Sequence, residues 1–166
     1  MRLVIDSMLG SLARWLRILG YDTIYYRNVE DWLLINIAKK EDRVLITRDL
    51  SLYRRALSKG VKSVYIDAFD DVADALAILS IRLGIDLTFK ESKTRCPKCN
   101  TELMLVPKAE VLHLIPKNVA LNHDKFWRCP KCNKVYWQGA HWKTIDDVLK
   151  RANNKRISGT EVPSNA

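Results

Sequence analysis

The apolar residues of the first ninety positions alternate between short continuous runs and stripes with a spacing of three or four residues. Short β-branched runs are typical of buried strands, and the wider spacing is typical of helices with one buried face. The pattern predicts strands at 3–5, 23–26, 44–47 and 64–66, and helices at 8–19, 31–40, 50–59 and from Asp70 through 85. This alternation predicts a parallel sheet covered by helices, an α/β fold.

The chain opens with the first half of a strand–helix–strand unit. Asp6 ends the first apolar run, and Ser7 is expected to cap the helix that follows. Gly20 stands where a helix commonly ends in a left-handed residue. Because ligands of open α/β sheets bind at the carboxyl ends of the strands, Asp6 is the first candidate for a functional residue.

The last predicted helix of this region is more apolar than one sheet face requires. One stripe is made by Val72, Leu76, Leu79 and Leu83, and Ile78, Ile81 and Ile85 add a second stripe. The surplus indicates contact with the following module or with another subunit, which would make the protein a homo-oligomer.

Three acids are predicted to meet at one edge of the sheet. Asp6 and Asp49 follow apolar strands, and Asp31 opens the helix after the second strand. Carboxylates gathered at one edge repel one another unless a cation lies between them, and oxygen ligands suit Mg²⁺ or Mn²⁺. The alternative is that each acid only caps a helix or forms a turn.

The segments VIDSMLGSLARWLRILGYDTIYY and EDWLLINIAKKEDRVLITRDLSL resemble the PIN-like ribonuclease domain at the carboxyl terminus of the mut-seven exonuclease. The resemblance covers residues 1–150, and prokaryotic relatives carry a zinc ribbon behind the domain. It implies a metal-dependent ribonuclease in which Asp6, Asp31 and Asp49 hold Mg²⁺ or Mn²⁺. Many PIN-like sites have a further acid where this chain has Ser51.

Three arginines lie near these acids in the sequence. Arg14 and Arg17 are one turn apart on the first helix, and Arg48 directly precedes Asp49. A guanidinium group can hold phosphate oxygens in a bidentate manner, so all three are candidates for contact with the substrate. The alternative for Arg14 and Arg17 is a solvated helix face.

The motif CPKCN occurs twice, and it predicts a zinc site formed by Cys96, Cys99, Cys129 and Cys132. Four thiolates leave no open coordination position, so the zinc is expected to be structural. The 29 residues between Cys99 and Cys129 can hold further strands or a short helix. Disulfides are the alternative, which an intracellular location disfavours.

Basic and aromatic residues surround the second motif. Lys125, Arg128, Lys131 and Lys134 are candidates for contact with RNA. Aromatic rings interleaved with basic residues can stack on bases, but most of these rings are expected to form the small core of the ribbon instead. They are Phe126, Trp127, Tyr136, Trp137 and Trp142.

The sequence divides into a nuclease domain at 1–92, a zinc ribbon with a closing helix at 93–152 and a disordered tail at 153–166. The closing helix is expected at 145–152, with Thr144 and Asp147 forming a capping box. Residues 1–92 hold 14 basic and 13 acidic side chains, and residues 93–166 hold 14 and 6. A basic appendage on a neutral domain suggests a polyanionic partner such as RNA.

No apolar run reaches the length of about 20 residues that a bilayer requires, and the amino terminus has no signal-peptide pattern. The sequence therefore predicts a cytoplasmic protein that acts on RNA, with tRNA, rRNA and the ribosome as candidate partners. A noncatalytic RNA- or ribosome-binding protein is the alternative. A phosphoryl-accepting signalling domain fits less well, because Asp6 lacks a neighbouring acid.

Overall fold

The computed structural model describes residues 1–159. Its first sheet is fully parallel, in the order β2-β1-β3-β4. The strands are β1 (Arg2–Ile5), β2 (Asp22–Tyr25), β3 (Val44–Thr47) and β4 (Ser63–Tyr65). The helices that cover it are α1 (Gly10–Ile18), α2 (Asp31–Lys40), α3 (Leu50–Ser58) and α4 (Val72–Leu83). A 3-10 turn, η1 (Ser7–Leu9), precedes α1. The predicted α/β fold is thus confirmed.

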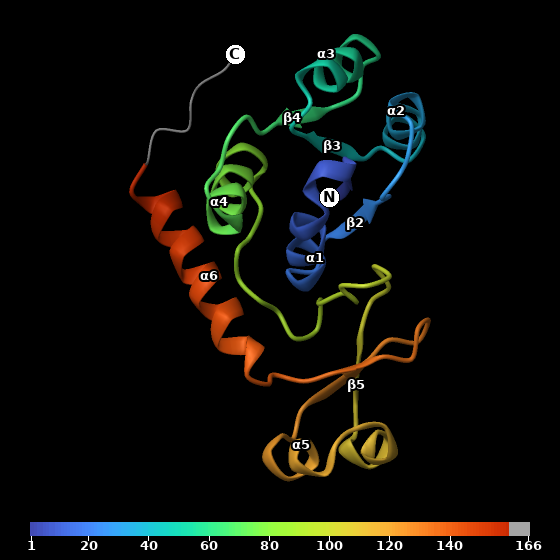
Figure 1. Ribbon diagram of the computed structural model, residues 1–166, viewed down its shortest axis with the longest axis vertical. Helices are drawn as coiled ribbons and strands as arrows, with labels where there is room; N and C mark the ends of the chain where they lie inside the picture. Colours follow the sequence, from blue (N-terminus) through green and yellow to red (C-terminus); the bar gives the residue numbers. More distant parts are fainter. Residues whose placement is uncertain (160–166) are drawn as a thin grey trace.

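Alternate residues of the strands face two separate cores. Leu3 and Ile5 pack on the side covered by α1 and α4, whereas Val4 packs on the side covered by α2 and α3. All three side chains are fully buried. The continuous apolar runs noted in the sequence arise because both faces of the sheet are covered. Figure 1 shows the sheet between its two helical layers.

The second module is a small antiparallel sheet with an insertion. Its strands, in the order β5-β6-β7, are β5 (Met104–Val106), β6 (Phe126–Arg128) and β7 (Val135–Tyr136). Between β5 and β6 lie two 3-10 turns, η2 (Lys108–Glu110) and η3 (Leu112–Leu114), and the short helix α5 (Lys117–Asn122). A short helix in the gap between the two cysteine motifs was among the features expected from the sequence.

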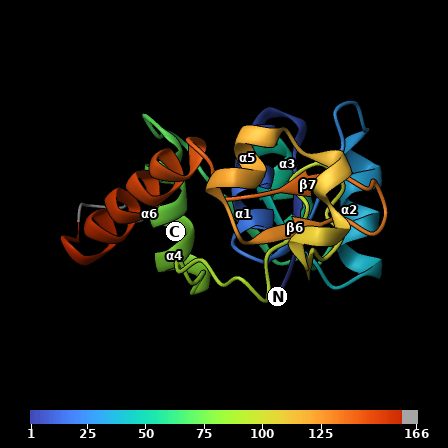
Figure 2. The same cartoon turned by 90° about the horizontal axis from the view of Figure 1, so that it is seen from below.

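The last helix, α6 (His141–Ile157), leaves the ribbon and returns along α4, as Figures 1 and 2 show. Val148, Leu149 and Ala152 are buried in the same core cluster as the apolar face of α4. The surplus apolar surface predicted on α4 is therefore covered by the following module. Ile81 remains 46% exposed.

Two details of the predicted closing helix are wrong. The helix begins at His141, so Thr144 lies inside it and the expected capping box does not form. Trp142 anchors this earlier start, because its ring lies edge-on to Phe89 with centroids 4.5 Å apart. A capping box instead opens α4, between Asp71 and Asp74.

The expected start of a disordered tail at residue 153 is also wrong, because the helix continues to Ile157. Ion pairs from Arg151 to Asp71 and from Lys155 to Asp74 hold this part of α6 against α4. The rest of the predicted tail, 160–166, lies outside the described residues. Within residues 1–159, no helix is both long and apolar enough to cross a membrane.

Candidate functional site

The switch point of the sheet, where the strand order reverses, lies between β1 and β3. The chain runs from β1 to β2 on one side and then returns to place β3 on the other side of β1. Ile5 at the end of β1 pairs with Ile46 of β3, so the residues that follow the two strands are neighbours. Ligands of open α/β sheets bind at such a switch point, outside the carboxyl ends of the strands.

Asp6 lies at this switch point and is hydrogen-bonded to the end of β3. Its side chain is 4% exposed. Oδ1 accepts a hydrogen bond from the backbone N–H of Met8 at 2.7 Å, and Oδ2 accepts one from Oγ1 of Thr47 at 2.5 Å. Asp6, and not Ser7 as expected, therefore caps the first helical turn. Both oxygens of the buried carboxylate accept a hydrogen bond, as a buried charge requires, and within residues 1–159 Oδ1 keeps a further lone pair.

Asp49 is connected to Asp6 through Thr47. The backbone N–H of Asp49 donates to Oγ1 of Thr47 at 2.9 Å. Asp49 also caps α3, because Oδ1 accepts from the backbone N–H groups of Ser51 and Leu52 at 2.8 and 3.0 Å. In the described part of the chain, its Oδ2 accepts no hydrogen bond, so this oxygen is open to a ligand at the carboxyl edge of the sheet.

Asp31 opens α2 at the same edge, where it forms an ion pair with Arg55 of α3. The pairing is possible because α2 and α3 cover the same face of the sheet. Sequence reasoning did not identify Arg55. The two residues are 24 positions apart, and only the packing of the two helices brings them together.

The three acids share one edge, but their carboxylates do not form a single tight cluster. Among the described residues, the only group of three or more His, Cys, Asp or Glu side chains whose ligand atoms lie within 4.8 Å of one another is the four-cysteine group. Mg²⁺ commonly takes one or two carboxylates and completes its shell with water and phosphate oxygens, so a looser arrangement suits it.

The three candidate arginines occupy different environments. Arg48 is exposed, and its guanidinium lies 5.0 Å from the centre of the Phe69 ring. Arg14 is exposed on α1. Arg17 is only 7% exposed, and burial lowers the pKa of its guanidinium.

Arg17 connects the α/β domain to the first cysteine motif. Its Nε donates to the backbone oxygen of Thr23 at 2.9 Å, and its Nη1 donates to the backbone oxygens of Pro97 and Lys98 at 2.8 and 3.3 Å. These bonds give Arg17 a structural role that helical spacing did not reveal. The signal is absent from the sequence because all three acceptors are backbone oxygens.

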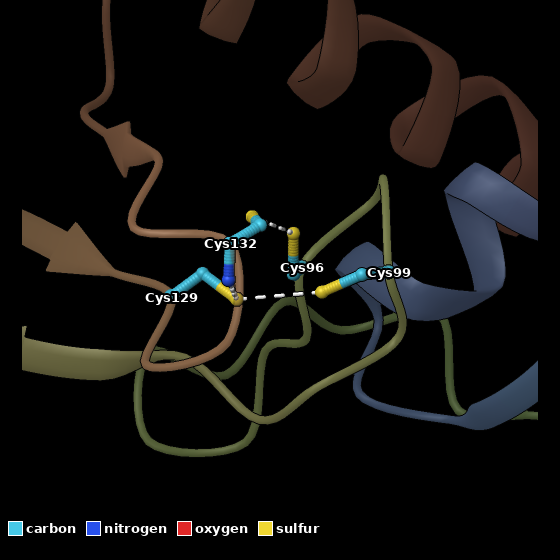
Figure 3. A group of neighbouring side chains, drawn as sticks. All are labelled: Cys96, Cys99, Cys129 and Cys132. Carbon is cyan, nitrogen blue, oxygen red and sulfur yellow. Dashed lines mark hydrogen bonds between the residues drawn. The ribbon is translucent and has the colours of Figure 1, made fainter.

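The four cysteine sulfurs face one another (Figure 3). Sγ of Cys96 lies 3.7 Å from Sγ of Cys132, and Sγ of Cys99 lies 3.4 Å from Sγ of Cys129. A tetrahedral zinc with bonds of about 2.3 Å places its sulfurs about 3.8 Å apart, whereas a disulfide requires about 2 Å. The cluster therefore fits a structural zinc ion, as the spacing of the motifs predicted.

The two CPKCN motifs have the same local geometry. The backbone N–H groups of Asn100 and Asn133 donate to the carbonyls of Cys96 and Cys129, both at 2.9 Å. Both asparagines adopt positive φ, 68° and 59°, a conformation that Asn tolerates better than most residues. The hydroxyl of Tyr136 lies 3.1 Å from Sγ of Cys96, and burial raises the pKa of this hydroxyl.

Asn100 also docks the first motif against strand β2. Its Oδ1 accepts from the backbone N–H of Thr23 at 3.0 Å, and its Nδ2 donates to Asp22 at 2.7 Å. Burial raises the pKa of Asp22, but hydrogen bonds from Arg43 and Asn100 outweigh this effect, and the pKa lies below the ordinary value of 3.8. No pattern in the sequence indicates these contacts.

The four basic residues predicted around the second motif differ in their surroundings. Lys125 pairs with Glu91 at 2.7 Å, and Arg128 is half-buried. Lys131 is exposed, and Lys134 lies 5.4 Å from the centre of the Tyr136 ring. Phe126 and Trp127 are buried in the ribbon, as expected.

Comparison with known proteins agrees with this architecture. The family model described as the Mut7-C RNAse domain matches residues 1–149, a range that includes both the parallel sheet and the four cysteines. Neither a curated protein nor a solved structure gave a match. A match over this much of the chain covers the switch point, the cysteine cluster and the start of α6 together. The chain therefore belongs to the Mut7-C RNAse domain family.

Proposed function

We propose that this protein is a metal-dependent ribonuclease whose reaction takes place at the carboxyl edge of the parallel sheet. The observation that carries the proposal is the linked pair Asp6 and Asp49 at the switch point, joined through Oγ1 of Thr47. Membership of an RNase domain family supports RNA as the substrate.

The residues at this edge have the donor set that Mg²⁺ or Mn²⁺ requires. Oδ2 of Asp49 is open, and Asp6 and Asp31 supply further carboxylate oxygens at the same edge. When bound there, such an ion activates water and stabilises the charge that develops on a phosphodiester. Arg48 next to Asp49 can hold a phosphate oxygen and orient the scissile bond.

The ion pair between Asp31 and Arg55 bears on the same edge. In the absence of a cation, Arg55 neutralises one of the acids and reduces their mutual repulsion. The same pair favours the alternative, a noncatalytic RNA-binding protein, because Arg55 competes with a metal ion for Asp31. Ser51, where many related sites carry a further acid, favours the alternative as well.

The test is the variant Asp49→Asn, assayed on labelled single-stranded RNA with Mg²⁺ and with Mn²⁺. Asn caps a helix as well as Asp does, so α3 is preserved while a metal-ligand charge is lost. Cleavage is expected to fall at least about 100-fold with RNA binding nearly unchanged, since a bound metal contributes several kcal/mol to the transition state.

Asp71→Asn is the matched control, because Asp71 caps α4 in the same way and is not part of the proposed site. It should cleave RNA at the wild-type rate. Wild-type cleavage by Asp49→Asn would refute the site. A wild-type protein that binds RNA but is inert with both metals would favour the noncatalytic alternative.

A further inference from the structure

A cleft of about 950 Å³ lies where α1 and the end of β2 meet the two cysteine motifs. From the α/β domain it is lined by residues of α1, β2 and the β2–α2 connection, and from the ribbon by residues of the first CPKCN motif, by Lys134 directly after the second motif, and by β7. The lining residues are Gly10, Ser11, Arg14, Arg17, Tyr25, Arg27, Pro97, Lys98, Lys134 and Tyr136. The cleft is therefore formed only when both modules are folded and docked.

The charge of this lining is of one sign. Five of the ten lining residues are basic and none is acidic. Within residues 1–159, the side chains of Arg14, Arg27, Lys98 and Lys134 form no ion pair with a carboxylate, whereas Lys125 on the same module is paired with Glu91. Unpaired cations that line one cavity attract a polyanion.

Two tyrosine rings stand among these cations. The hydroxyl of Tyr25 donates to the backbone oxygen of Ser7 at 3.2 Å, which fixes its ring against the start of α1. Gly10 permits this contact, because a Cβ there would lie 2.7 Å from the ring. Tyr136 lines the opposite module. Aromatic faces within a basic groove are the arrangement that binds single-stranded nucleic acid, through stacked bases and neutralised phosphates.

The cleft also adjoins the edge where Asp6 lies. Ser7, whose carbonyl holds Tyr25, directly follows Asp6, and Arg27 lies on the connection that leads to Asp31. Residues that line or fix the cleft are thus near two of the three acids in the chain.

We propose that this inter-module cleft is the binding site for single-stranded RNA, in which Arg14, Arg27, Lys98 and Lys134 contact the phosphates and Tyr25 and Tyr136 contact bases. The proposal rests on the proposed function for the identity of the polymer. It places the main RNA-binding surface at the junction of the two modules and not on the outer face of the ribbon. Arg17 shapes the cleft by tying α1 to the first motif.

The test compares two triple variants that remove the same number of charges. The cleft variant carries Arg27→Gln, Lys98→Gln and Lys134→Gln. The control carries Lys39→Gln, Lys59→Gln and Lys62→Gln, which are exposed residues at the opposite edge of the sheet. Binding of a fluorescent single-stranded RNA of about 12 nucleotides, within the usual site size of such grooves, is measured by anisotropy without Mg²⁺ or Mn²⁺.

At about 0.1 M salt, the cleft variant is expected to raise Kd at least about tenfold, and the control to change it less than about twofold. The log–log salt slope of the cleft variant should be smaller by about 2, because each phosphate contact on a single strand contributes about 0.7. An equal loss of RNA affinity in the two variants, or no loss of affinity in the cleft variant, would overturn the proposal. Zinc content and thermal unfolding of both variants verify that they fold.

A second measurement does not depend on any variant. RNA that carries 4-thiouridine should crosslink on irradiation to peptides that contain Tyr25 or Tyr136, and crosslinks confined to the 107–123 insertion would contradict the cleft. Cleavage is scored separately. A wild type that cleaves RNA while the cleft variant binds normally refutes the cleft alone, and cleft-dependent binding without any cleavage refutes the proposed catalysis alone.

Discussion

Oδ1 of Asn100 accepts a hydrogen bond from the backbone N–H of Thr23 at 3.0 Å, which joins a cysteine motif to the edge of the parallel sheet. Strand β2 is the outer strand on that side, and an uncovered edge presents unpaired backbone groups to other chains. Arg17 donates a hydrogen bond to the backbone oxygen of Thr23. The ribbon therefore covers the β2 edge of the parallel sheet, and it also forms one wall of the basic cleft.

The first prediction concerns this contact. Asn100→Gly should lower the free energy of unfolding by about 1–3 kcal/mol, because the backbone N–H of the fully buried Thr23 loses its acceptor. Glycine tolerates the positive φ of this position, so backbone strain is not added. Urea denaturation measures the change.

Asn133→Gly is the matched control at the corresponding position of the second motif. Its φ is also positive, and within residues 1–159 its side chain makes only a long contact of 3.5 Å with Arg128. A change within about 0.5 kcal/mol is expected for this surface position. If the two variants lose equal stability, the docking role of Asn100 is wrong.

The second prediction is one tightly held zinc ion per chain. Elemental analysis of protein purified without added metal should detect it, because the four sulfurs already lie within 4.8 Å of one another. Cys129→Ser should abolish zinc binding and expose the ribbon to proteolysis, since binding of a structural zinc is coupled to folding. A metal-free preparation in which the ribbon resists proteolysis would contradict this prediction.

The third prediction separates backbone strain from steric contact at two glycines. Gly20 and Gly60 both have positive φ, 93° and 74°. A Cβ added at Gly20 would lie 2.7 Å from the backbone oxygen of Lys93, whereas a Cβ added at Gly60 would meet nothing within 4 Å. Gly60→Ala should lower the free energy of unfolding by about 1–2 kcal/mol, because alanine is strained in the left-handed conformation.

Gly20→Ala should cost more than Gly60→Ala, because the backbone at Lys93 must also move. Thermal unfolding of both variants checks the order. If the two variants lost equal stability, the backbone at Lys93 would be able to move without an energetic penalty.

The fourth prediction is a pH dependence of the packing of α6 on α4. The hydrogen bond from Arg151 lowers the pKa of Asp71 below its ordinary value of 3.8, although burial acts in the opposite direction. A carboxyl with a depressed pKa stabilises the fold above the ordinary pKa, and this contribution is lost as the pH falls through the lower, folded-state value.

Asp71→Asn keeps the helix cap but removes the charge, so its stability should be slightly below wild type at neutral pH. The effect is small because the two side chains are 43% and 39% exposed and water screens the pair. The difference between the two proteins should vanish in strong acid, where both release zinc alike. A difference that stays constant from neutral pH to below the pKa of Asp71 would show that Arg151 is not responsible.

The sequence by itself determined the sheet, its helices and the metal cluster. Val44 to Thr47 form the predicted strand and Asp31 to Lys40 the predicted helix, because apolar spacing reports directly which faces are buried. The paired CPKCN motifs sufficed for the zinc site, because ligand identity and local spacing decide tetrahedral coordination.

Only the tertiary structure decided what lies between the modules. The pairing of Asp31 with Arg55, the burial of Arg17 and the docking of Asn100 on Thr23 join residues far apart in the chain. Several of these bonds end on backbone atoms, which carry no sequence signature. The basic cleft depends on the same docking, because neither module contains its full lining. Local patterns therefore specified the elements, and the packing of those elements specified the surface on which RNA is proposed to bind.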